Sequence, residues 1–400
     1  MILRSAYALI LAMTLASIPV RVPAQNSDGP ANFDALRTEL WPDAQAKGIT
    51  RANFDLAFAG LAPDPRVLAA TRRQPEYGKP VGDYVNGIVS KNNITVGLRK
   101  ATEWNETLTA VEKKFAVERW VLLSIWGMET SYGALKDKWD MFRSLATLAN
   151  ARYRHPYFRN ELLVALRIMQ EGHIPRDKMV SSWAGAMGQT QFMPSNFMDY
   201  AIDFNGDGRR DIWNNVPDVL GSTGNYLNKE KWKYGLAWGF EAALPPKFDY
   251  RKSRASFAEW TKLGVRRADG GAFPASGNGI LFFPSGAVGP GFIVTENYDV
   301  LKEYNNSDAY AIAVGHLADR LRGGGPIRAA WPKDDRQLPR DLRIVLQRKL
   351  AELGYPIKKF EGHIDFDIRD HVRKEQVKYG MIPDGHPTAI LLEHMGVKTR

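Results

Sequence analysis

The chain of 400 residues contains no cysteine. No disulfide can therefore stabilise the fold, and neither a cysteinyl metal site nor a thiol nucleophile is available. Lipid attachment also needs a cysteine near the N-terminus of the mature chain, so we expect that the protein is not a lipoprotein.

Long apolar runs are also scarce. An apolar stretch from Ala6 to Ile18 follows Arg4 and leads to small residues that end at Ala24. This is the pattern of a cleavable secretory signal, and the stretch is shorter than the roughly 20 residues that a transmembrane anchor, the alternative, requires. We expect a signal peptide at residues 1–24, cleavage near Ala24 and, in a Gram-negative source, a periplasmic protein.

Charge is not concentrated in blocks. The net charge is +10, of which Arg4 and Arg21 belong to the expected signal. No Lys/Arg block or nucleic-acid motif occurs, so we expect no nucleic-acid partner. The excess favours an anionic partner such as a cell-wall polymer, although a solvated basic surface explains it equally well.

The hydrophobic pattern divides the chain. Helical spacing dominates residues 33–115, where several prolines interrupt it, and residues 116–230, where glycine-rich loops join the segments. Between about 240 and 294 the pattern changes to short β-like runs at Gly279–Phe283 and Gly291–Thr295. Helical spacing returns at 305–321. No repeat of fixed period is present, so the sequence does not support a solenoid. We predict a mainly α fold with a small strand-rich lobe.

The last 70 residues predict a separate module. Glycine and proline between 323 and 339 indicate a linker, which we place at residues 326–335. The domain after it, residues 336–397, contains two helical segments. The first shows apolar spacing and ends before Gly354; the second precedes the turn Asp384-Gly385.

One glutamate lies on an apolar helix face. Leu122, Ile125, Trp126 and Glu129 fall at positions i, i+3, i+4 and i+7, and Gly133 is the predicted end of this helix. Desolvation should raise the pKa of Glu129, as a general acid near neutral pH requires. Periodicity alone favours a simpler alternative, in which a carboxylate at a helix end reaches solvent.

Two loops carry further candidates. Residues 181–195 contain closely spaced small residues and amides, which let a backbone approach a ligand, although an ordinary tight loop has the same composition. The segment Asp203–Gly208 resembles the start of an EF-hand calcium loop, with glycine at position 6. Its candidate ligands at positions 1, 3, 5 and 7 are Asp203, Asn205, Asp207 and Arg209, the last through its carbonyl. Arg210 at position 8 and Asn214 at position 12 depart from the pattern, and the alternative is an Asx-rich turn.

Three motifs resemble those of the membrane-bound lytic murein transglycosylase B family and occur in the same order along the chain. They lie at residues 126–133, 185–195 and 200–208. The resemblance covers residues 33–325. It implies a lysozyme-like helical catalytic core with a helical lobe and a small strand-rich lobe. It also implies cleavage of the β-1,4 bond between N-acetylmuramic acid and N-acetylglucosamine in peptidoglycan, with formation of 1,6-anhydromuramyl ends and without a cofactor for the chemistry.

The resemblance also implies roles for individual residues. Glu129 falls at the family's catalytic glutamate, and Asp218 is our candidate for the acid that closes a slightly longer loop around a structural calcium ion. Tyrosine, glutamine, asparagine and serine side chains can pack on sugars or bind their hydroxyl and acetamido groups. The positions that match the family's glycan groove are Tyr84, Ser182, Gln191, Tyr226, Tyr304 and Asn305.

A single acid suffices for such an enzyme. Ordinary glycosidases need two carboxylates, yet we find no second acid in a comparable setting and interpret Asp137, Asp140, Glu171 and Asp177 as solvated surface acids. In the family the 6-hydroxyl of the substrate is the nucleophile. Two alternatives stay open: a two-carboxylate muramidase and a non-catalytic wall-binding protein.

The tail resembles the small three-helix peptidoglycan-binding module of cell-wall enzymes. Glu375 stands where that module usually has an aromatic residue, and the usual glycine before the second helix is missing. The resemblance therefore predicts the fold better than it predicts binding, and a docking domain is the alternative. Proteins of cell-wall synthesis or division are candidate partners, and the oligomeric state stays open.

Overall fold

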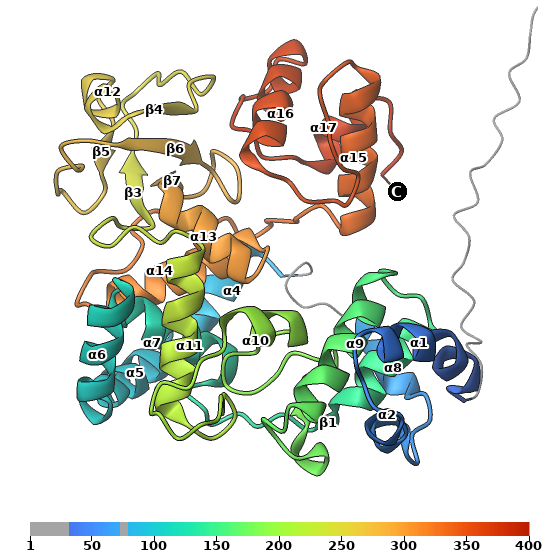
Figure 1. The fold of residues 1–400 in the computed structure, drawn as a ribbon. Coiled ribbons are helices and arrows are strands. Elements are labelled where there is room, and N and C mark those ends of the chain that lie inside the picture. The colour runs from blue at the N-terminus through green and yellow to red at the C-terminus, as the bar shows by residue number, and fades with distance from the viewer. Residues whose placement is uncertain (1–31, 73–78, 400) are drawn as a thin grey trace, which may run out of the picture.

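The computed structural model describes residues 32–72 and 79–399. The predicted signal peptide, residues 1–24, lies outside them. Helices dominate, and a small sheet forms a lobe on one side of the molecule (Figure 1), as the mainly α prediction requires. None of the helices in the described ranges is long and apolar enough to cross a membrane.

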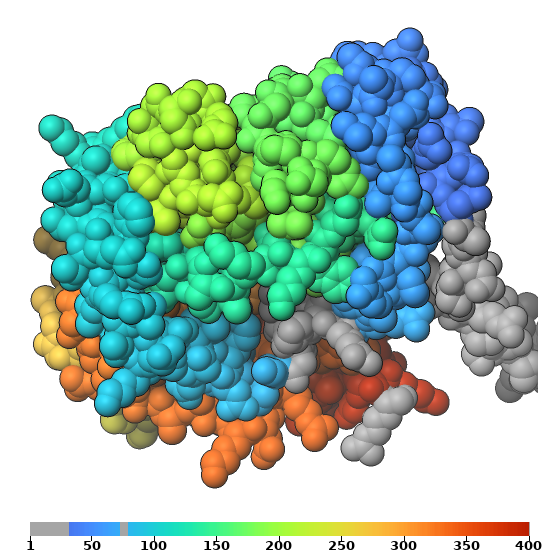
Figure 2. Space-filling view, turned by 90° about the horizontal axis from the view of Figure 1, so that it is seen from below, coloured from blue at the N-terminus to red at the C-terminus, as the bar shows by residue number. Residues whose placement is uncertain are grey.

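The N-terminal helices form a lobe with two later ones. Thr50 and Asp64 accept hydrogen bonds from the amides of Asn53 and Arg66 and so cap the second and third helices. The lobe consists of α1 (Asp34–Ala46), α2 (Arg51–Phe58), α3 (Pro65–Thr71), α8 (Met141–Asn150) and α9 (Tyr157–Gln170). Figure 2 shows the blue N-terminal helices beside green segments on one face of the molecule.

The central unit is built around one buried helix, α7 (Arg119–Thr130). Its residues 121–127 are buried because α5, α11 and α14 surround it, and the Ser124 hydroxyl donates to the Val314 carbonyl at 2.6 Å. The other helices of the unit are α4 (Val81–Ile88), α5 (Lys91–Glu103), α6 (Asn105–Phe115), α10 (Pro194–Tyr200), α11 (Val216–Lys229), α13 (Glu296–Tyr304) and α14 (Asp308–Leu321).

The end of α7 differs from the sequence prediction. The helix stops at Thr130, before Gly133, because Ser131 already adopts a left-handed conformation with φ 49° and Tyr132 follows at 59°. The amide of Ser131 donates to the Gly127 carbonyl and so closes the last turn. Gly133, also left-handed, then donates its amide to the Thr130 hydroxyl.

The strand-rich lobe is an antiparallel sheet in the order β4-β6-β7-β3-β5. The two predicted β-like runs form its adjacent strands, β6 (Asn278–Phe282) and β7 (Gly291–Val294), in which Leu281 pairs with Ile293. The remaining elements are β3 (Gly239–Ala243), β4 (Arg254–Ser256), β5 (Arg266–Arg267) and the helix α12 (Phe257–Lys262). A second sheet of two strands, β1 (Trp139–Asp140) and β2 (Val180–Ser181), follows the end of α7 and was not predicted; the 3₁₀ helix η2 (Arg176–Lys178) precedes β2.

Residues 326–335 lie outside helices and strands but are bound to the lobes on either side. The amides of Arg328 and Ala329 donate to the Glu241 carboxylate, and buried Asp335 accepts hydrogen bonds from the Ser285 hydroxyl and the Val81 amide. The tail that follows has its own apolar core and consists of α15 (Arg340–Glu352), α16 (Phe366–Lys378) and α17 (Ala389–His394). Figure 1 shows this red module beside the strand-rich lobe.

The module packs against the rest of the protein through buried charges on α16. The Arg369 guanidinium donates to Asp308 Oδ2 at 2.6 Å, and Lys302 and the Tyr298 hydroxyl both donate to Oδ1. Burial alone would raise the pKa of Asp308, but Lys302 and Arg369 hold it well below its ordinary value. Arg373 adds a hydrogen bond to the Leu281 carbonyl. The module is therefore anchored by groups that are costly to leave unpaired.

We expect Arg369→Ala to lower the free energy of unfolding by about 3 kcal/mol, because Asp308 then loses one of its two cationic partners in a buried setting. The measurement is urea unfolding of the full chain. Arg348→Ala, an exposed arginine on α15, is the matched control and should change the free energy by less than about 0.5 kcal/mol. Equal values for the two variants would contradict the anchoring role.

Candidate functional site

Glu129 lies in the last turn of α7, half-buried. The hydroxyl of Tyr310, from α14, donates to Glu129 Oε1 at 2.6 Å. Burial and the neighbouring Glu129 charge raise the pKa of Tyr310 well above its ordinary value, so Tyr310 keeps its proton and acts as the donor. Sequence reasoning missed Tyr310, because a tyrosine in an alanine-rich helix has the pattern of an ordinary packing residue.

Two of the predicted tyrosines join Tyr310 in one aromatic cluster. The rings of Tyr304 and Tyr310 are nearly parallel, with centroids 6.4 Å apart, and the Tyr226 ring meets Tyr304 edge-on at 4.8 Å. Phe192 contacts both Tyr226 and Tyr304; it belongs to the loop of residues 182–193 between β2 and α10, which we call the glycine-rich loop. Tyr226 is only 4% exposed, so most of its ring serves packing, and the Tyr304 hydroxyl donates to the Thr190 carbonyl at 2.7 Å.

Three other predicted contact residues, Tyr84, Asn305 and Ser182, lie outside this aromatic cluster. The Tyr84 hydroxyl contacts Met128 Sδ at 3.9 Å, which places Tyr84 at the last turn of α7. Asn305 directly follows Tyr304 and ends α13. Ser182 closes its own turn, since its hydroxyl accepts from the Ala186 amide at 3.1 Å.

The glycine-rich loop is joined to α7 through Gln189. Its side-chain oxygen accepts from the Trp126 indole at 2.8 Å, and its side-chain nitrogen donates to the Trp213 carbonyl at 2.8 Å. The Thr130 hydroxyl donates to the Gln189 carbonyl. A Cβ at Gly133 would lie 2.2 Å from the Gln189 side-chain oxygen, so only glycine fits there. Sequence reasoning included Gln189 in a motif without assigning it a role.

Gln191 contacts an acid that the sequence interpretation misjudged. Its side-chain nitrogen donates to Asp137 Oδ1 at 3.1 Å and to the Gly188 carbonyl at 2.9 Å. Asp137 is half-buried and also accepts from the Gly188 amide at 3.0 Å. Burial raises the pKa of Asp137 to about 6, although the hydrogen bonds from Gln191 and Gly188 act in the opposite direction. The interpretation of Asp137 as a solvated surface acid was wrong, because these long-range contacts are not visible in the sequence.

The other three acids have partners elsewhere. Asp140 caps α8 by accepting from the Arg143 amide and pairs with Arg176. Glu171 pairs with Arg167, and Asp177 is exposed beside Lys178. None of these contacts involves the cluster around Glu129, and Asp177 is a solvated surface acid as expected.

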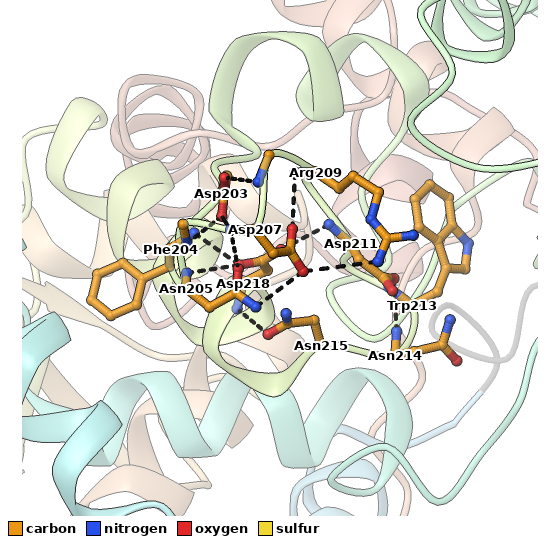
Figure 3. Close-up of polar contacts among 12 residues, drawn as sticks. Asp203, Phe204, Asn205, Asp207, Arg209, Asp211, Trp213, Asn214, Asn215 and Asp218 are labelled. Atoms are coloured by element: carbon orange, nitrogen blue, oxygen red, sulfur yellow. Dashed lines mark hydrogen bonds and ion pairs between the residues drawn. The ribbon is translucent and has the colours of Figure 1, made fainter.

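The acidic loop between α10 and α11 is closed by its own amides (Figure 3). The Asp203 carboxylate accepts from the amides of Gly206, Asp207 and Gly208, at 2.6 to 3.1 Å. Gly206 and Gly208 have φ values of 81° and 86°, which favour glycine. Asn205 bonds to Asp207 through its side chain, and the Arg209 amide donates to Asp207 Oδ1.

Asp218 closes this loop from the first turn of α11. It is fully buried and accepts from the amides of Phe204 and Asp211, each at 2.8 Å. Burial raises the pKa of Asp218, and the charge of Asp203 raises it further. The donor set, which consists of carboxylate and amide oxygens, fits the hard cation Ca²⁺. Within the described ranges, however, no three His, Cys, Asp or Glu side chains converge as metal ligands.

The sequence is similar to a known protein family and to one of its characterised members. The model of the transglycosylase SLT domain family matches residues 32–319. The membrane-bound lytic murein transglycosylase B of Escherichia coli (strain K12) is 29% identical over 246 residues, which span 60% of this chain and 66% of that protein.

Solved structures agree with the family match. SltB3 from Pseudomonas aeruginosa, solved in complex with NAG-anhNAM-pentapeptide, is 41% identical with a TM-score of 0.82 and covers 92% of this chain and 100% of its own. The Escherichia coli lytic transglycosylase Slt35 in complex with calcium has a TM-score of 0.62 over 72% of this chain and 92% of its own; at 23% identity it supports the fold alone.

The family model covers well over half of the chain and includes α7, the glycine-rich loop and α14 up to Asp319. The lysozyme-like architecture expected from the sequence is confirmed by these matches. The chain therefore belongs to the transglycosylase SLT domain family, and residues 32–319 form its lytic transglycosylase domain.

Proposed function

We propose that the protein is a lytic murein transglycosylase that cleaves the β-1,4 bond between N-acetylmuramic acid and N-acetylglucosamine and leaves 1,6-anhydromuramyl ends. The observation that carries the proposal is the position of Glu129 at the end of buried α7, with Tyr310 donating to its carboxylate. The 41% identical relative solved with NAG-anhNAM-pentapeptide, a ligand with an anhydro sugar, supports the product type.

The mechanism needs one carboxyl group used twice. Protonated Glu129 gives its proton to the oxygen of the leaving N-acetylglucosamine as the bond from that oxygen to the muramyl anomeric carbon breaks. The 6-hydroxyl of the same muramyl residue then attacks the anomeric carbon, and ionised Glu129 accepts the hydroxyl proton. One C–O bond breaks, one forms, and the carboxyl group returns to its protonated state without water or a second acid.

Tyr310 fits both states of this cycle. Its hydroxyl donates to Glu129 Oε1, so the proton that is transferred resides on Oε2. When Glu129 is ionised, the same hydrogen bond stabilises the carboxylate. Tyr310 is 1% exposed, which holds its hydroxyl in place without competition from bulk water.

The surrounding residues would bind the glycan. Tyr304 stacks on Tyr310 and Tyr84 contacts Met128, the residue before Glu129, so these two are the stronger candidates for sugar contacts. Asn305 follows Tyr304, and Gln191 follows Thr190, whose carbonyl accepts from Tyr304, so we propose them as further contacts. The buried ring of Tyr226 supports Tyr304 from behind. The hydroxyl of Ser182 shapes its own turn, and its part in binding would be through the position of that turn.

Glu129→Gln should lower the rate of glycan cleavage by at least about 100-fold, because an amide can neither donate nor accept the transferred proton in this way. Cleavage is measured by mass spectrometry of purified sacculi after digestion. Glu106→Gln makes the same chemical change at an exposed site on α6 and should be as active as the unaltered protein. Substantial cleavage by Glu129→Gln would contradict the assignment, and intact binding of sacculi would separate lost chemistry from lost folding.

Tyr310→Phe should lower turnover by about 10- to 100-fold, since a hydrogen bond to a charged group is worth roughly 1.5–3 kcal/mol. The phenyl ring preserves the packing against Tyr304. The exposed Tyr234 provides the control, Tyr234→Phe, which should leave turnover unchanged. Equal turnover of both variants would remove Tyr310 from the mechanism.

We also propose that the acidic loop binds a structural Ca²⁺ ion. Asp203, Asn205, Asp207 and Asp218 would hold it with side-chain oxygens, and Arg209 would add its backbone carbonyl. The relative solved in complex with calcium supports the idea, as does the burial of the Asp218 carboxyl group near Asp203. The ion would stabilise the segment between the glycine-rich loop and α11 and would take no part in the chemistry.

Calcium at 100 times its Kd should then stabilise the protein by about 2.7 kcal/mol, seen as a higher Tm. Asp203→Asn removes one ligand charge and should abolish most of the shift. Magnesium at the same concentration controls for ionic strength. An unchanged Tm on calcium titration would show that the loop is an Asx-rich turn held by its own amides.

The domain boundaries follow from the same reasoning. We propose a signal peptide at 1–24 for export to the periplasm, a catalytic domain at 33–325, a connecting segment at 326–335 and a peptidoglycan-binding-like module at 336–397. The charges that anchor α16 to Asp308 and the strand-rich lobe favour a docking role for this module. Glycan strands are the proposed partner in solution.

A further inference from the structure

Asp137 is brought to the glycine-rich loop by the small sheet β1–β2. It follows the end of α7 and stands two residues before Trp139, which pairs with Ser181. Strand β2 leads directly into the loop, where the isolated pairs Ser181 with Met187 and Met187 with Phe192 continue the ladder. Asp137 and Gln191, 54 residues apart in the chain, therefore meet through backbone pairing.

The contacts of Gln191 fix the orientation of its side-chain amide. A primary amide nitrogen has two N–H groups, and here they face two acceptor groups, the Gly188 carbonyl and the Asp137 carboxylate, whose Oδ1 and Oδ2 lie 3.1 and 3.3 Å from the nitrogen. Rotation of the amide by 180° would place Oε1 against a carboxylate and a carbonyl, which repel it. The Gly188 amide in turn donates to Asp137 Oδ2, so the carboxylate itself is held in place.

The backbone at this point is also constrained. Gln191 has a φ of 52°, in the left-handed region that few residues other than glycine adopt. Such a conformation costs on the order of 1–3 kcal/mol and persists where surrounding contacts enforce it. The contacts of Gln191 with Gly188 and Asp137 enforce this backbone conformation, and they fix the position of the Gln191 side chain.

The side-chain oxygen of Gln191, Oε1, is available to accept a hydrogen bond from a ligand. Gln191 is half-buried, and Oε1 accepts no hydrogen bond from any residue in the described part of the chain. The preceding residue, Thr190, accepts from Tyr304, whose ring stacks on Tyr310, the partner of Glu129. The oxygen therefore lies in the segment that adjoins the proposed catalytic carboxyl group.

We propose that Asp137 is a positioning residue that holds the Gln191 amide with its oxygen toward the glycan, so that this subsite selects a hydrogen-bond donor of the sugar, an acetamido N–H or a hydroxyl. The inference rests on the proposed function of the site. Asp137 acts through Gln191 and touches no substrate itself. With a pKa of about 6, raised by burial, it is mostly ionised at pH 7.5 and therefore a strong acceptor.

The test compares Asp137→Asn, Gln191→Ala and the double variant of the full chain. Asparagine has the shape of aspartate, but when its oxygen serves the Gly188 amide its NH₂ group replaces Oδ1, the nearer acceptor of the Gln191 nitrogen. We expect each single variant to lower kcat/KM on a soluble oligomer of alternating N-acetylglucosamine and N-acetylmuramic acid by about 10-fold. The double variant should be no worse than Gln191→Ala alone.

Asp177→Asn, which removes the same charge at an exposed position, is the matched control and should retain full activity. Activity of Asp137→Asn equal to that of the unaltered protein would overturn the proposal. So would a 10-fold loss from Asp137→Asn that persists in the Gln191→Ala background, because a purely structural defect acts in both backgrounds. This comparison decides even if Asp137→Asn lowers Tm.

The outcome is separate from that of the proposed function. If the unaltered protein forms no anhydromuramyl product, the transglycosylase proposal itself fails. If it forms that product and the Asp137 and Gln191 variants are not coupled, only the positioning role of Asp137 is wrong.

Discussion

The buried side-chain amide of Gln189 is the contact on which the geometry of the site depends. It accepts from the Trp126 indole and donates to the Trp213 carbonyl, and so it joins three segments that are far apart in the chain: α7, the glycine-rich loop and the end of the acidic loop. Gln189 is only 6% exposed, so an unpaired group on its side chain would be costly. Gly133 leaves the space that the amide occupies.

The segments near this contact supply the residues that surround Glu129 in the proposed site. Helix α14 supplies Tyr310, which fixes one carboxyl oxygen. The loop that Gln189 anchors supplies Thr190, which orients Tyr304, and Gln191, whose amide is held by Asp137. A single carboxyl group with a fixed donor is suited to a reaction in which the substrate provides its own nucleophile. The carboxylate of Asp137 is bound by the Gln191 side chain and the Gly188 amide, which is consistent with the proposed intramolecular chemistry.

The sequence predicted what depends on local pattern. The apolar face that ends at Glu129, the adjacent strands β6 and β7 and the helix that includes residues 308–321 all follow from spacing that a short window contains. Tyr310 and Asp137 were missed or misread because their roles come from contacts 181 and 54 residues away, which no local pattern encodes. The end of α7 was misplaced because Ser131 adopts a left-handed conformation that sequence rules assign to glycine. The raised pKa expected for Glu129 stays a prediction.

The most direct test of the central claim is the source of the oxygen at the new glycan ends. Sacculi are digested by the mature protein in water enriched in ¹⁸O, and the muropeptides are examined by mass spectrometry. Attack by the substrate's own 6-hydroxyl predicts 1,6-anhydromuramyl ends that contain no ¹⁸O. Reducing N-acetylmuramic acid ends that carry ¹⁸O would contradict the account, because they require water as the nucleophile and hence a hydrolase.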